Sequence, residues 1–407
     1  MTILMLLLGS FPPDNRVEKE LDALIQSGFQ VSLLCFKAEA KPEIENYKGM
    51  KIYRRIPVLP KWRYYLNLMT LYLFYYDHSF YREIIKLSKE ESFEGIHVHD
   101  LPLTKTAIAV KKQLGCKVVL DMHENFPAGL RVWAKGSWRR GFKAWIYDKI
   151  FTRYSKWSNY EKKMCELVDA IIVVVDEMKD RLINDLFINE SKITIVSNTE
   201  KKDICNQDIK NIPVNKEEFK IIYAGGVGPE RGVDTIISAL NRLKDSSYKF
   251  SIVGSGDANY LSFLKNLSVQ ENVADQVEWV GFKSYDIFLS YIASSQVSVI
   301  PHHFNAHTDN TIPHKLFQSM GLGTPLLVSS CRPLKRVVES SNSGLVFEAG
   351  NIEDCAEKIE LLRSNSKMTQ QFGLNGVAAI KDGLFCWEKD AEVLSCFYKD
   401  LFERSKS

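Results

Sequence analysis

Short apolar runs alternate along this chain with longer amphipathic stretches, and no other feature restricts the possible folds as strongly. In the first half these runs cover residues 3–8, 31–36, 95–99, 117–121, 170–175 and 193–196. The pattern begins again at Phe219, with runs at 221–226, 250–253, 277–280, 297–301, 326–329 and 345–347. Strands that alternate with helices form mainly parallel sheets that helices cover on both faces. The sequence therefore predicts an α/β protein with two doubly wound domains.

Length and one polar segment set the expected domain boundaries. At 407 residues the chain is too long for one compact core and long enough for two domains that each bury an interior. Residues 198–218 are polar and without clear periodicity, so we expect a linker there, with a first domain at 1–200 and a second at 201–387. Residues 388–402 follow a helical pattern. Its apolar stripe consists of Val393, Phe397 and Leu401 and needs a surface to pack on.

The cysteines and the apolar start of the chain bear on its location. The eight cysteines are scattered and include no Cys-x-x-Cys pair, which suits reduced thiols in a cytosolic protein and suggests no structural zinc. Residues 3–8 lack a basic leader and are too few for a signal peptide, so we expect a buried first strand. No stretch approaches the roughly 18 uninterrupted apolar residues of a spanning helix. We therefore expect a cytoplasmic protein that can still lie on a membrane surface.

The segment 307–325 combines a polar loop, a short helix and a Gly-Thr-Pro turn. Pro313 presets the backbone for a first helical turn. The residues before it are of types that cap helices, namely Asp309, Asn310 and Thr311. Free amide N–H groups and the positive end of the helix would then face the loop, where Lys315 adds a cation. The segment predicts a site for a negatively charged ligand.

Polar residues follow several predicted strands at the point where each strand ends. In open parallel sheets, ligands bind beyond the carboxyl ends of the strands. In the first half these residues are Ser10, Asp14, Asn15, Arg16, His99, Asp100, Asp121, His123, Glu124 and Asn125. In the second half the corresponding loops are 225–232, 254–256 and 302–315. Two such sets predict a ligand cleft between facing domains.

A glycine-rich turn, residues 225–232, connects the first strand of the second domain to the next helix. Glycine lets the backbone approach a phosphate, and Arg231 can supply a charge-assisted hydrogen bond. The glycine spacing misses the dinucleotide fingerprint G-x-G-x-x-G by one residue. An ordinary tight turn is therefore the alternative interpretation.

Three histidines lie in or just after predicted strands of the first half. His123 follows a strand, where its imidazole can reach a reacting centre. His97 and His99 alternate on one strand and share a face, and with Asp100 they suggest a metal site. Further ligands at diagnostic spacing are not evident, so we expect no metal and regard hydrogen-bonded histidines at the end of a sheet as the alternative.

The segment 131–163 differs in composition from the rest of the chain. It holds four of the seven tryptophans and ten Lys or Arg against two Asp or Glu, a local net charge of +8. Such a mixture suits a bilayer interface, where rings sit among headgroups and cations meet anionic lipid. We expect peripheral contact with an anionic membrane, to which residues 62–81 can add; the alternative is a solvated helix with its aromatic residues packed inward. Because no reader motif accompanies the patch, we expect no nucleic-acid partner.

Taken together, these motifs resemble those of the retaining glycosyltransferases of family 4, which have the two-domain GT-B fold. The resemblance spans nearly the whole chain. In the first half it rests on Asp14-x-Arg16-Val17, Val98-His99-Asp100-Leu101-Pro102, Asp121-x-His123-Glu124-Asn125, Asp169 and Ser197-Asn198-Thr199. In the second half it rests on Tyr223-Ala224-Gly225-Gly226, Arg231-Gly232-Val233-Asp234, Val253-Gly254-x-Gly256, Pro313-x-Lys315-Leu316-Phe317 and Gly323-Thr324-Pro325.

The resemblance implies two Rossmann-like domains facing across a cleft, with residues 388–407 packed back on the first domain. The second domain would bind a nucleotide-sugar, and the first would present the acceptor. No cofactor and no metal would be required, since basic side chains and a helix end stabilise the departing nucleoside diphosphate. Arg231 stands at the family's lysine position and Lys315 is a second cation. His123 looks like the histidine that contacts the donor sugar near the reacting carbon, so these three are the expected catalytic residues.

The expected substrate-binding residues come from both halves. They are Ser10, Asp14, Arg16, His99, Asp100, Glu124, Asn125, Gly225, Gly226, Gly254, Asn310, Thr311, Ile312 and Gln318. Many relatives carry two glutamates eight positions apart where this chain has Asn310 and Gln318, and an arginine where it has Gly226. The two amides can still bond to sugar and ribose hydroxyls, but neither carries charge.

The implied function is transfer of a sugar from a UDP- or GDP-sugar to a lipid-linked or growing glycan. The expected setting is synthesis of cell-surface polysaccharide or lipopolysaccharide at the inner face of the cell membrane. A sugar-nucleotide epimerase is one alternative, in which His123, Glu124 and Asp100 would act as acid and base. A catalytically weak nucleotide-binding subunit of another transferase is the other, and it would explain the missing glutamates.

Overall fold

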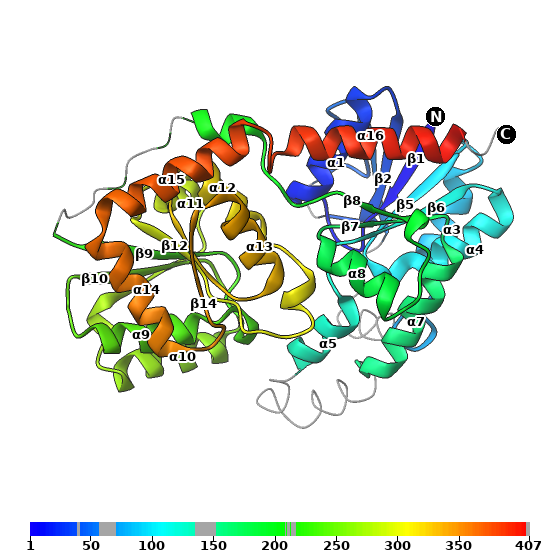
Figure 1. The fold of residues 1–407 in the computed structure, drawn as a ribbon. Helices are drawn as coiled ribbons and strands as arrows, with labels where there is room; N and C mark the ends of the chain where they lie inside the picture. The colour runs from blue at the N-terminus through cyan, green and yellow to red at the C-terminus, as the bar shows by residue number, and fades with distance from the viewer. Residues whose placement is uncertain are drawn as a thin grey trace. The chain divides into compact units, whose positions relative to one another are not determined.

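The chain folds into two α/β units, drawn as a ribbon in Figure 1. The computed structural model describes residues 1–38, 41–56, 71–134, 152–207, 209, 212 and 217–403. Unit 1 consists of residues 1–197 and the C-terminal segment from Asp390, and unit 2 consists of residues 198–389. Each unit has one main sheet with helices on both of its faces (Figure 1). The predicted α/β class with two doubly wound sheets is confirmed.

Unit 1 is built on an eight-stranded sheet in the order β3-β4-β2-β1-β5-β6-β7-β8. Its strands are β1 (Thr2–Leu6), β2 (Gln30–Phe36), β3 (Ile44–Tyr47), β4 (Met50–Ile56), β5 (Gly95–His99), β6 (Lys117–Met122), β7 (Ala170–Val173) and β8 (Ile193–Ile195). Neighbouring strands are parallel except β3 and β4, which pair in antiparallel fashion at one edge. The six apolar runs of this half are confirmed as strands. We missed β3 and β4, because charged residues interrupt their apolar pattern.

The helices of unit 1 cover both faces of this sheet. They are α1 (Asn15–Gln26), α3 (His78–Leu87), α4 (Thr104–Leu114), α5 (Phe126–Ala134), α7 (Tyr154–Leu167), α8 (Asp176–Asn184) and α16 (Trp387–Glu403), the last of which begins in unit 2. Helix α1 and helix α16 lie on one face, and α4 and α7 lie on the other (Figure 1). The Asp14 carboxylate caps α1 by accepting hydrogen bonds from the backbone N–H groups of Arg16 and Val17, both at 3.1 Å. This cap fixes the first turn, from which Arg16 and Glu20 project on the same side.

Unit 2 is built on a six-stranded parallel sheet in the order β11-β10-β9-β12-β13-β14. Its strands are β9 (Phe219–Ala224), β10 (Tyr248–Val253), β11 (Val277–Gly281), β12 (Val297–Ile300), β13 (Leu326–Ser329) and β14 (Gly344–Phe347). Its helices are α9 (Val233–Leu243), α10 (Ala258–Gln270), α11 (Tyr285–Ala293), α12 (His314–Gly321), α13 (Arg332–Ser341), α14 (Ile352–Ser364) and α15 (Ser366–Lys381). The core includes Ile221 and Tyr223 of β9, Phe250 of β10 and Val299 of β12, all fully buried. Every strand predicted for this half is present.

Helix α16 packs on unit 1 with a face one residue away from the predicted stripe. Leu394, Tyr398 and Phe402 are buried, whereas Val393 is 36% exposed. Phe402 lies so close to Gly95 of β5 that an added Cβ would come within 2.8 Å of its ring. The predicted spacing of four is therefore right, but the buried residues are the next ones along the chain; of the predicted stripe, Phe397 and Leu401 are half-buried and Val393 is exposed. The surface of unit 1 on which α16 packs determines which face of the helix is buried. Tyr398 was missed because its hydroxyl makes it a polar residue in a search for apolar side chains.

Part of the segment predicted as a linker packs within unit 2. Asn198 Nδ2 donates a hydrogen bond to the carbonyl of Ile312 at 2.9 Å, and Glu200 is buried. A short 3-10 helix follows at Lys202–Asn206. Among the helices that the structure describes, none is long and apolar enough to cross a bilayer.

Candidate functional site

Asp121, at the end of β6, is the centre of a buried polar group in unit 1. Its Oδ1 accepts a hydrogen bond from Arg16 Nη2 at 2.8 Å. Its Oδ2 accepts from Arg16 Nε at 3.2 Å and lies 3.2 Å from His99 Nδ1 and 2.6 Å from His123 Nε2. Burial alone would raise the pKa of Asp121, but the charges of Arg16 and His123 hold it well below its usual range. Asp121 is therefore a fixed anion that orients three side chains.

His123 carries a positive charge at neutral pH. Burial acts to lower its pKa, but the carboxylates of Asp100 and Asp121 outweigh burial and raise the pKa to about 10. Its Nδ1 lies 3.6 Å from Asp100 Oδ2, and its side chain is 21% exposed. Asp100 has φ 63° and ψ 162°, a backbone region that is essentially reserved for glycine. Strain of this kind clusters at functional sites, which supports a role for the Asp100–His123 pair.

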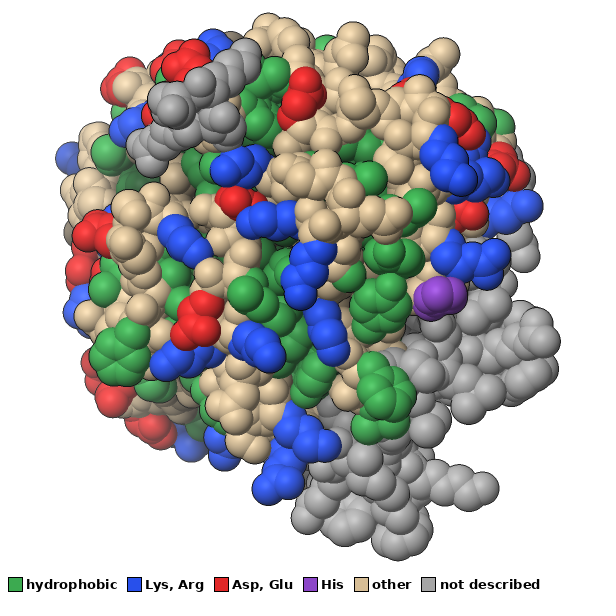
Figure 2. All heavy atoms as spheres, turned by 90° about the vertical axis from the view of Figure 1, so that its right-hand side faces the viewer, with side chains coloured by type: hydrophobic (Ala, Val, Ile, Leu, Met, Phe, Trp, Pro, Cys, Tyr) green, Lys and Arg blue, Asp and Glu red, His purple; other side chains and the backbone are tan. Residues whose placement is uncertain are grey.

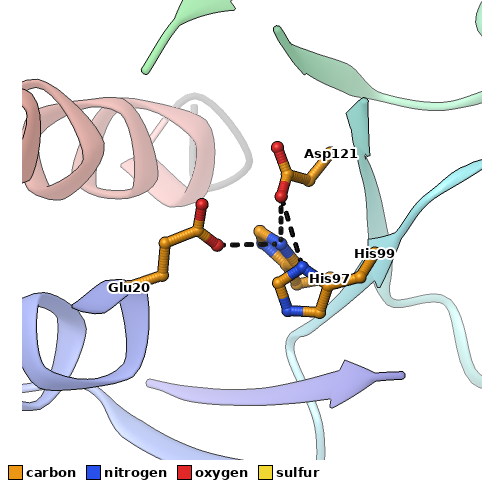
Figure 3. A group of neighbouring side chains, drawn as sticks. All are labelled: Glu20, His97, His99 and Asp121. Atoms are coloured by element: carbon orange, nitrogen blue, oxygen red, sulfur yellow. Dashed lines mark hydrogen bonds and ion pairs between the residues drawn. The ribbon is translucent and has the colours of Figure 1, made fainter. Parts of the chain in front are cut away.

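Four side chains of ligand type, Asp121 among them, lie together in unit 1, as Figure 3 shows. Glu20 of α1, His97 and His99 of β5, and Asp121 are all buried, and their candidate ligand atoms lie within 4.8 Å of one another. His97 Nε2 is 3.4 Å from Glu20 Oε2 and 3.6 Å from Asp121 Oδ2. Arg16 Nη2 also pairs with Glu20 at 2.9 Å. Carboxylate and imidazole donors are the types that bind a divalent metal, but here an arginine already pairs with both carboxylates.

The other residues predicted for unit 1 lie near this group in different roles. Ser10 is exposed in the loop after β1, and Asp14 caps α1. Glu124 is half-buried, directly after His123. Asn125 is buried, and its Oδ1 accepts a hydrogen bond from the backbone N–H of Ala128 at 3.2 Å, inside the first turn of α5. The side chain of Asn125 thus stabilises the start of a helix.

In unit 2, two glycine loops meet at the ends of β9 and β10. Gly225 has φ 129° and Gly254 has φ 152°, values that side-chain-bearing residues rarely adopt. A Cβ on Gly254 would lie 1.9 Å from the carbonyl oxygen of Gly225, so only glycine fits there. At Gly226 an added Cβ would meet open space. The backbone beside Gly226 is accordingly open to a ligand.

Lys315 and Arg231 bring two cations to these loops. The Lys315 ammonium lies 3.5 Å from the centre of the Tyr223 ring, a cation–π contact. Burial, and then the charge of Arg231, lowers the pKa of Lys315 well below its usual value. Arg231 Nη1 is 3.4 Å from His302 Nε2, and its Nε is 3.2 Å from Glu230 Oε1. The predicted pair of cations therefore exists as a local cluster within unit 2.

The loop before α12 differs in detail from the sequence-based expectation. Pro313 stands before the first helical residue and offers no capping acceptor, whereas we expected it inside the first turn. Asp309 does not cap α12; its carboxylate accepts from the backbone N–H and Nε of Arg332, at 2.8 and 2.5 Å. Asn310 Nδ2 donates to the carbonyl of Ala306 at 2.8 Å, while its buried Oδ1 has no hydrogen-bond partner among the described residues. Buried polar atoms are rarely unpaired, so this oxygen is available to a ligand donor.

Thr311, Ile312 and Gln318 complete the predicted set in unit 2. Thr311 is half-buried, and the carbonyl of Ile312 accepts from Asn198. Gln318 is buried, and its Nε2 donates to Glu200 Oε1 at 3.1 Å and lies 3.4 Å from the Tyr285 hydroxyl. A carboxylate therefore stands beside the amide at this position.

Four residues in these groups were not among our predictions: Glu20, Glu200, Tyr223 and Tyr398. Glu20 sits one helical turn after Arg16, and this spacing was the available signal for it. Tyr223 belongs to a motif that we had noted only for its glycines. Glu200 and Tyr398 contact their partners only through folding, since Tyr398 and His97 are 301 positions apart.

Two protein families match this chain in succession. The family described as Glycosyltransferase Family 4 matches residues 15–199. The family described as Glycosyl transferases group 1 matches residues 206–378. The two matches divide the chain at nearly the same place as the two structural units.

Similar proteins include named glycosyltransferases. An uncharacterised glycosyltransferase of Methanocaldococcus jannaschii is 24% identical over 360 residues, which are 88% of this chain and 87% of that protein. The capsular polysaccharide biosynthesis glycosyltransferase CapM of Staphylococcus aureus is 21% identical over 253 residues, 56% of this chain and 62% of that protein.

Solved structures share the fold over the full length. Sucrose-phosphate synthase from Thermosynechococcus elongatus aligns with a TM-score of 0.78 at 16% identity, covering 99% of both chains. The Anabaena protein HepE in complex with UDP-glucose aligns with a TM-score of 0.70 at 12% identity, covering 98% of this chain and 100% of that one. At these identities the likeness concerns the fold.

Proposed function

This chain belongs to the family-4-type glycosyltransferases with the GT-B fold, and from that membership we propose its reaction. It transfers a sugar from a nucleotide-sugar to a lipid-linked or growing glycan, with retention of the anomeric configuration. The setting is cell-surface polysaccharide or lipopolysaccharide synthesis, as the name of the CapM relative suggests. The donor is a UDP- or GDP-sugar that binds to unit 2, and unit 1 presents the acceptor.

The observation that carries this proposal is the pair of cations beside the glycine loops of unit 2. Within the part of the chain that the structure describes, the buried Lys315 ammonium has no carboxylate within ion-pair distance and rests on the Tyr223 ring instead. Burial and the charge of Arg231 make the charged form of Lys315 unfavourable, and the charge of Glu230 offsets this only in part. A diphosphate at the loops would supply a counter-charge, and the backbone beside Gly226 would let it approach.

The same cations favour bond cleavage. As the bond from the sugar to the β-phosphate breaks, negative charge develops on the departing oxygen. Arg231 and Lys315 oppose that charge, so they stabilise the transition state more than the bound donor. The first turn of α12, which Pro313 leaves uncapped, adds the positive end of a helix. These groups supply the positive charge that a metal ion supplies elsewhere, and we propose a reaction without metal or other cofactor.

In unit 1 we assign to His123 a contact with the sugar that is transferred. As an imidazolium held by Asp100 and Asp121, it can donate a hydrogen bond to a sugar hydroxyl but cannot act as a base at neutral pH. In an epimerase reaction it could therefore serve as the acid but not as the base, which would have to be Glu124 or Asp100.

We further propose that unit 1 contacts an anionic membrane, which places the enzyme at the cytoplasmic face. Residues 135–151 of the predicted patch lie outside the described residues. Of the remainder, Trp133 is 41% exposed, Tyr154 is 38% exposed, and Lys156 and Lys163 are exposed on α7. Trp157 is fully buried in the core and is not part of the patch, contrary to our expectation. Figure 2 shows a face on which Lys and Arg side chains lie among apolar ones.

A thermal-shift screen against UDP, GDP, ADP and their common sugar conjugates tests the donor assignment. A ligand that binds only the folded protein raises its stability by about 2.7 kcal/mol at 100 times its dissociation constant. We expect one nucleotide class to raise the melting temperature. The proposal fails if none of these compounds shifts it and none is hydrolysed or transferred.

A further inference from the structure

A chain of buried side chains leads from Asp121 to the C-terminal helix α16. We propose that Tyr398 and His97 are positioning residues, which hold the Asp121 carboxylate in place for His123. The chain runs from the Tyr398 hydroxyl through the His97 ring to Asp121 and then to His123. The inference rests on the proposed function, because its kinetic consequence concerns the same His123.

The contact between Tyr398 and His97 defines where the His97 proton lies. The Tyr398 oxygen is 2.6 Å from His97 Nδ1, and both side chains are fully buried. Within the described residues this nitrogen is the one acceptor that the Tyr398 hydroxyl has, so the hydroxyl donates to it. A nitrogen that accepts carries no proton in the neutral ring. His97 therefore carries its proton on Nε2.

The opposite edge of the His97 ring points at two carboxylates. Nε2 lies 3.4 Å from Glu20 Oε2 and 3.6 Å from Asp121 Oδ2, and Figure 3 shows the ring between them. These distances are within ion-pair range but long for a hydrogen bond, so the N–H acts mainly through its dipole. In the other tautomer a lone pair would face both oxygens and repel them. Tyr398 thus fixes the tautomer that attracts the carboxylates.

Asp121 Oδ2 passes this constraint to His123. The same oxygen lies 3.6 Å from His97 Nε2 and 2.6 Å from His123 Nε2. Arg16 donates to both oxygens of this carboxylate, from Nη2 to Oδ1 at 2.8 Å and from Nε to Oδ2 at 3.2 Å. This cationic fork orients the carboxylate, and the His97 N–H adds an attraction on Oδ2 at 3.6 Å. Loss of the His97 contact would weaken the hold on Oδ2, and His123, which contacts this oxygen, would lose part of its positioning.

The same four side chains, Glu20, His97, His99 and Asp121, have been considered above as a metal site, and two contacts argue against it. Arg16 pairs with both carboxylates, so a divalent ion would have to displace or repel a buried guanidinium. A metal-bound imidazole usually donates through its other nitrogen. In His97 that nitrogen accepts from Tyr398. The geometry of these four side chains suits a network of hydrogen bonds and ion pairs better than a metal site.

Imidazole ¹⁵N NMR of the full-length protein tests the tautomer directly. We expect His97 to show a protonated Nε2 and an accepting Nδ1, and the replacement Tyr398→Phe to shift the Nδ1 resonance. The replacement Tyr53→Phe is the matched control, since it removes a hydroxyl of a nearly buried tyrosine that bonds to Glu91 at 2.8 Å elsewhere in unit 1. A proton on Nδ1 of the wild-type ring would overturn the inference. So would one equivalent of bound metal in elemental analysis.

Kinetics test the consequence for the reaction, using whichever nucleotide-sugar the thermal screen identifies. We expect Tyr398→Phe to lower kcat on the order of tenfold and to leave the donor KM unchanged. The reason is that His123 loses part of the support that positions it. Tyr53→Phe should keep wild-type kcat. In the double variant Tyr398→Phe, His97→Asn the losses should be less than additive, since both residues act through one chain. Unchanged kcat in a folded Tyr398→Phe protein would reject the positioning role.

These two experiments separate the inference from the proposed function. If no nucleotide-sugar binds, the proposed function fails and the NMR experiment still decides the tautomer. If a donor binds and turns over while Tyr398→Phe behaves like wild type, the function stands and the inference fails.

Discussion

Glu200 Oε1 accepts a hydrogen bond from Gln318 Nε2 at 3.1 Å, and both side chains are buried in unit 2. At the position of Gln318 many family-4 relatives carry a glutamate, so the sequence alone suggests that a charge is missing. The structure places a carboxylate next to that position from a different part of the chain. The pair has one carboxylate and one amide, with the amide at 318 and the carboxylate at 200.

Restoring the glutamate alone should therefore destabilise the protein. In Gln318→Glu two buried carboxylates would lie within hydrogen-bond distance, and we expect a loss of about 2 kcal/mol in the free energy of unfolding at pH 7. Their mutual repulsion raises the pKa in the folded state, so the loss should vanish as the pH falls below the unfolded value of about 4. Urea unfolding at pH 7 and at pH 4 measures this. The double variant Glu200→Gln, Gln318→Glu should recover stability at pH 7, and a fully stable single variant would contradict the expectation.

Lys315 offers a test in which stability and binding move in opposite directions. Lys315→Met keeps most of the side-chain volume and removes a buried ammonium whose pKa burial already lowers. We expect the unliganded variant to melt at the same or a higher temperature than wild type. Its affinity for the nucleotide that stabilises wild type most should fall at least about tenfold, as expected for the loss of a charge-assisted contact. Isothermal titration calorimetry measures the affinity, and an unchanged affinity would remove Lys315 from the site.

The pH dependence of turnover should report the charge on His123. Its pKa is raised to about 10, so the imidazolium persists at neutral pH and activity should fall as the pH rises toward 10. Asp100→Asn removes one of the two carboxylates responsible, and we expect the alkaline limb of the kcat profile to move down by about one pH unit or more. Asp77→Asn is the control, because Asp77 is also buried in unit 1 but caps α3. Equal profiles for wild type and Asp100→Asn would argue against His123 as the titrating group.

The same shift has a consequence for stability. Because the folded-state pKa of His123 lies above its ordinary value of about 6.5, the stability that its charge contributes is fully present below pH 6.5 and is lost as the pH rises through 10. Thermal melting of wild type should therefore decline over that window more steeply than melting of Asp100→Asn.

The membrane proposal predicts a response to charge reversal on α7. Lys156→Glu with Lys163→Glu should weaken binding to anionic vesicles by at least about tenfold, since each Lys near such a surface contributes about 1 kcal/mol. Lys335→Glu with Lys367→Glu makes the same charge change at exposed positions of unit 2 and should leave binding intact. Vesicle sedimentation at low and high salt measures both. Equal losses in the two double variants would show a general charge effect and no defined contact surface.

Whether a feature could be predicted from the sequence depended on how far apart along the chain the interacting residues are. The ends of β5 and β13 agree with the predicted runs, because strand boundaries follow local apolar composition. The positions of His99, Asp121 and His123 at strand ends follow from those strands. The partners of these residues do not follow, because α1 and α16 reach them through tertiary packing. Asp309 shows the same limit, since it bonds to the backbone of Arg332 at the start of a neighbouring helix.

The placement of α16 also has a consequence for the order of synthesis. Unit 1 consists mainly of residues 1–197, yet Leu394, Tyr398 and Phe402 complete its interior. During synthesis, His97 lacks the Tyr398 hydroxyl that donates to it, and Gly95 of β5 lacks the Phe402 ring that covers it. Both contacts form only after α16 has left the ribosome. We expect the N-terminal unit to mature last. A chain arrested before residue 390 should expose that surface to proteases or chaperones, and pulse proteolysis of arrested chains would reveal it.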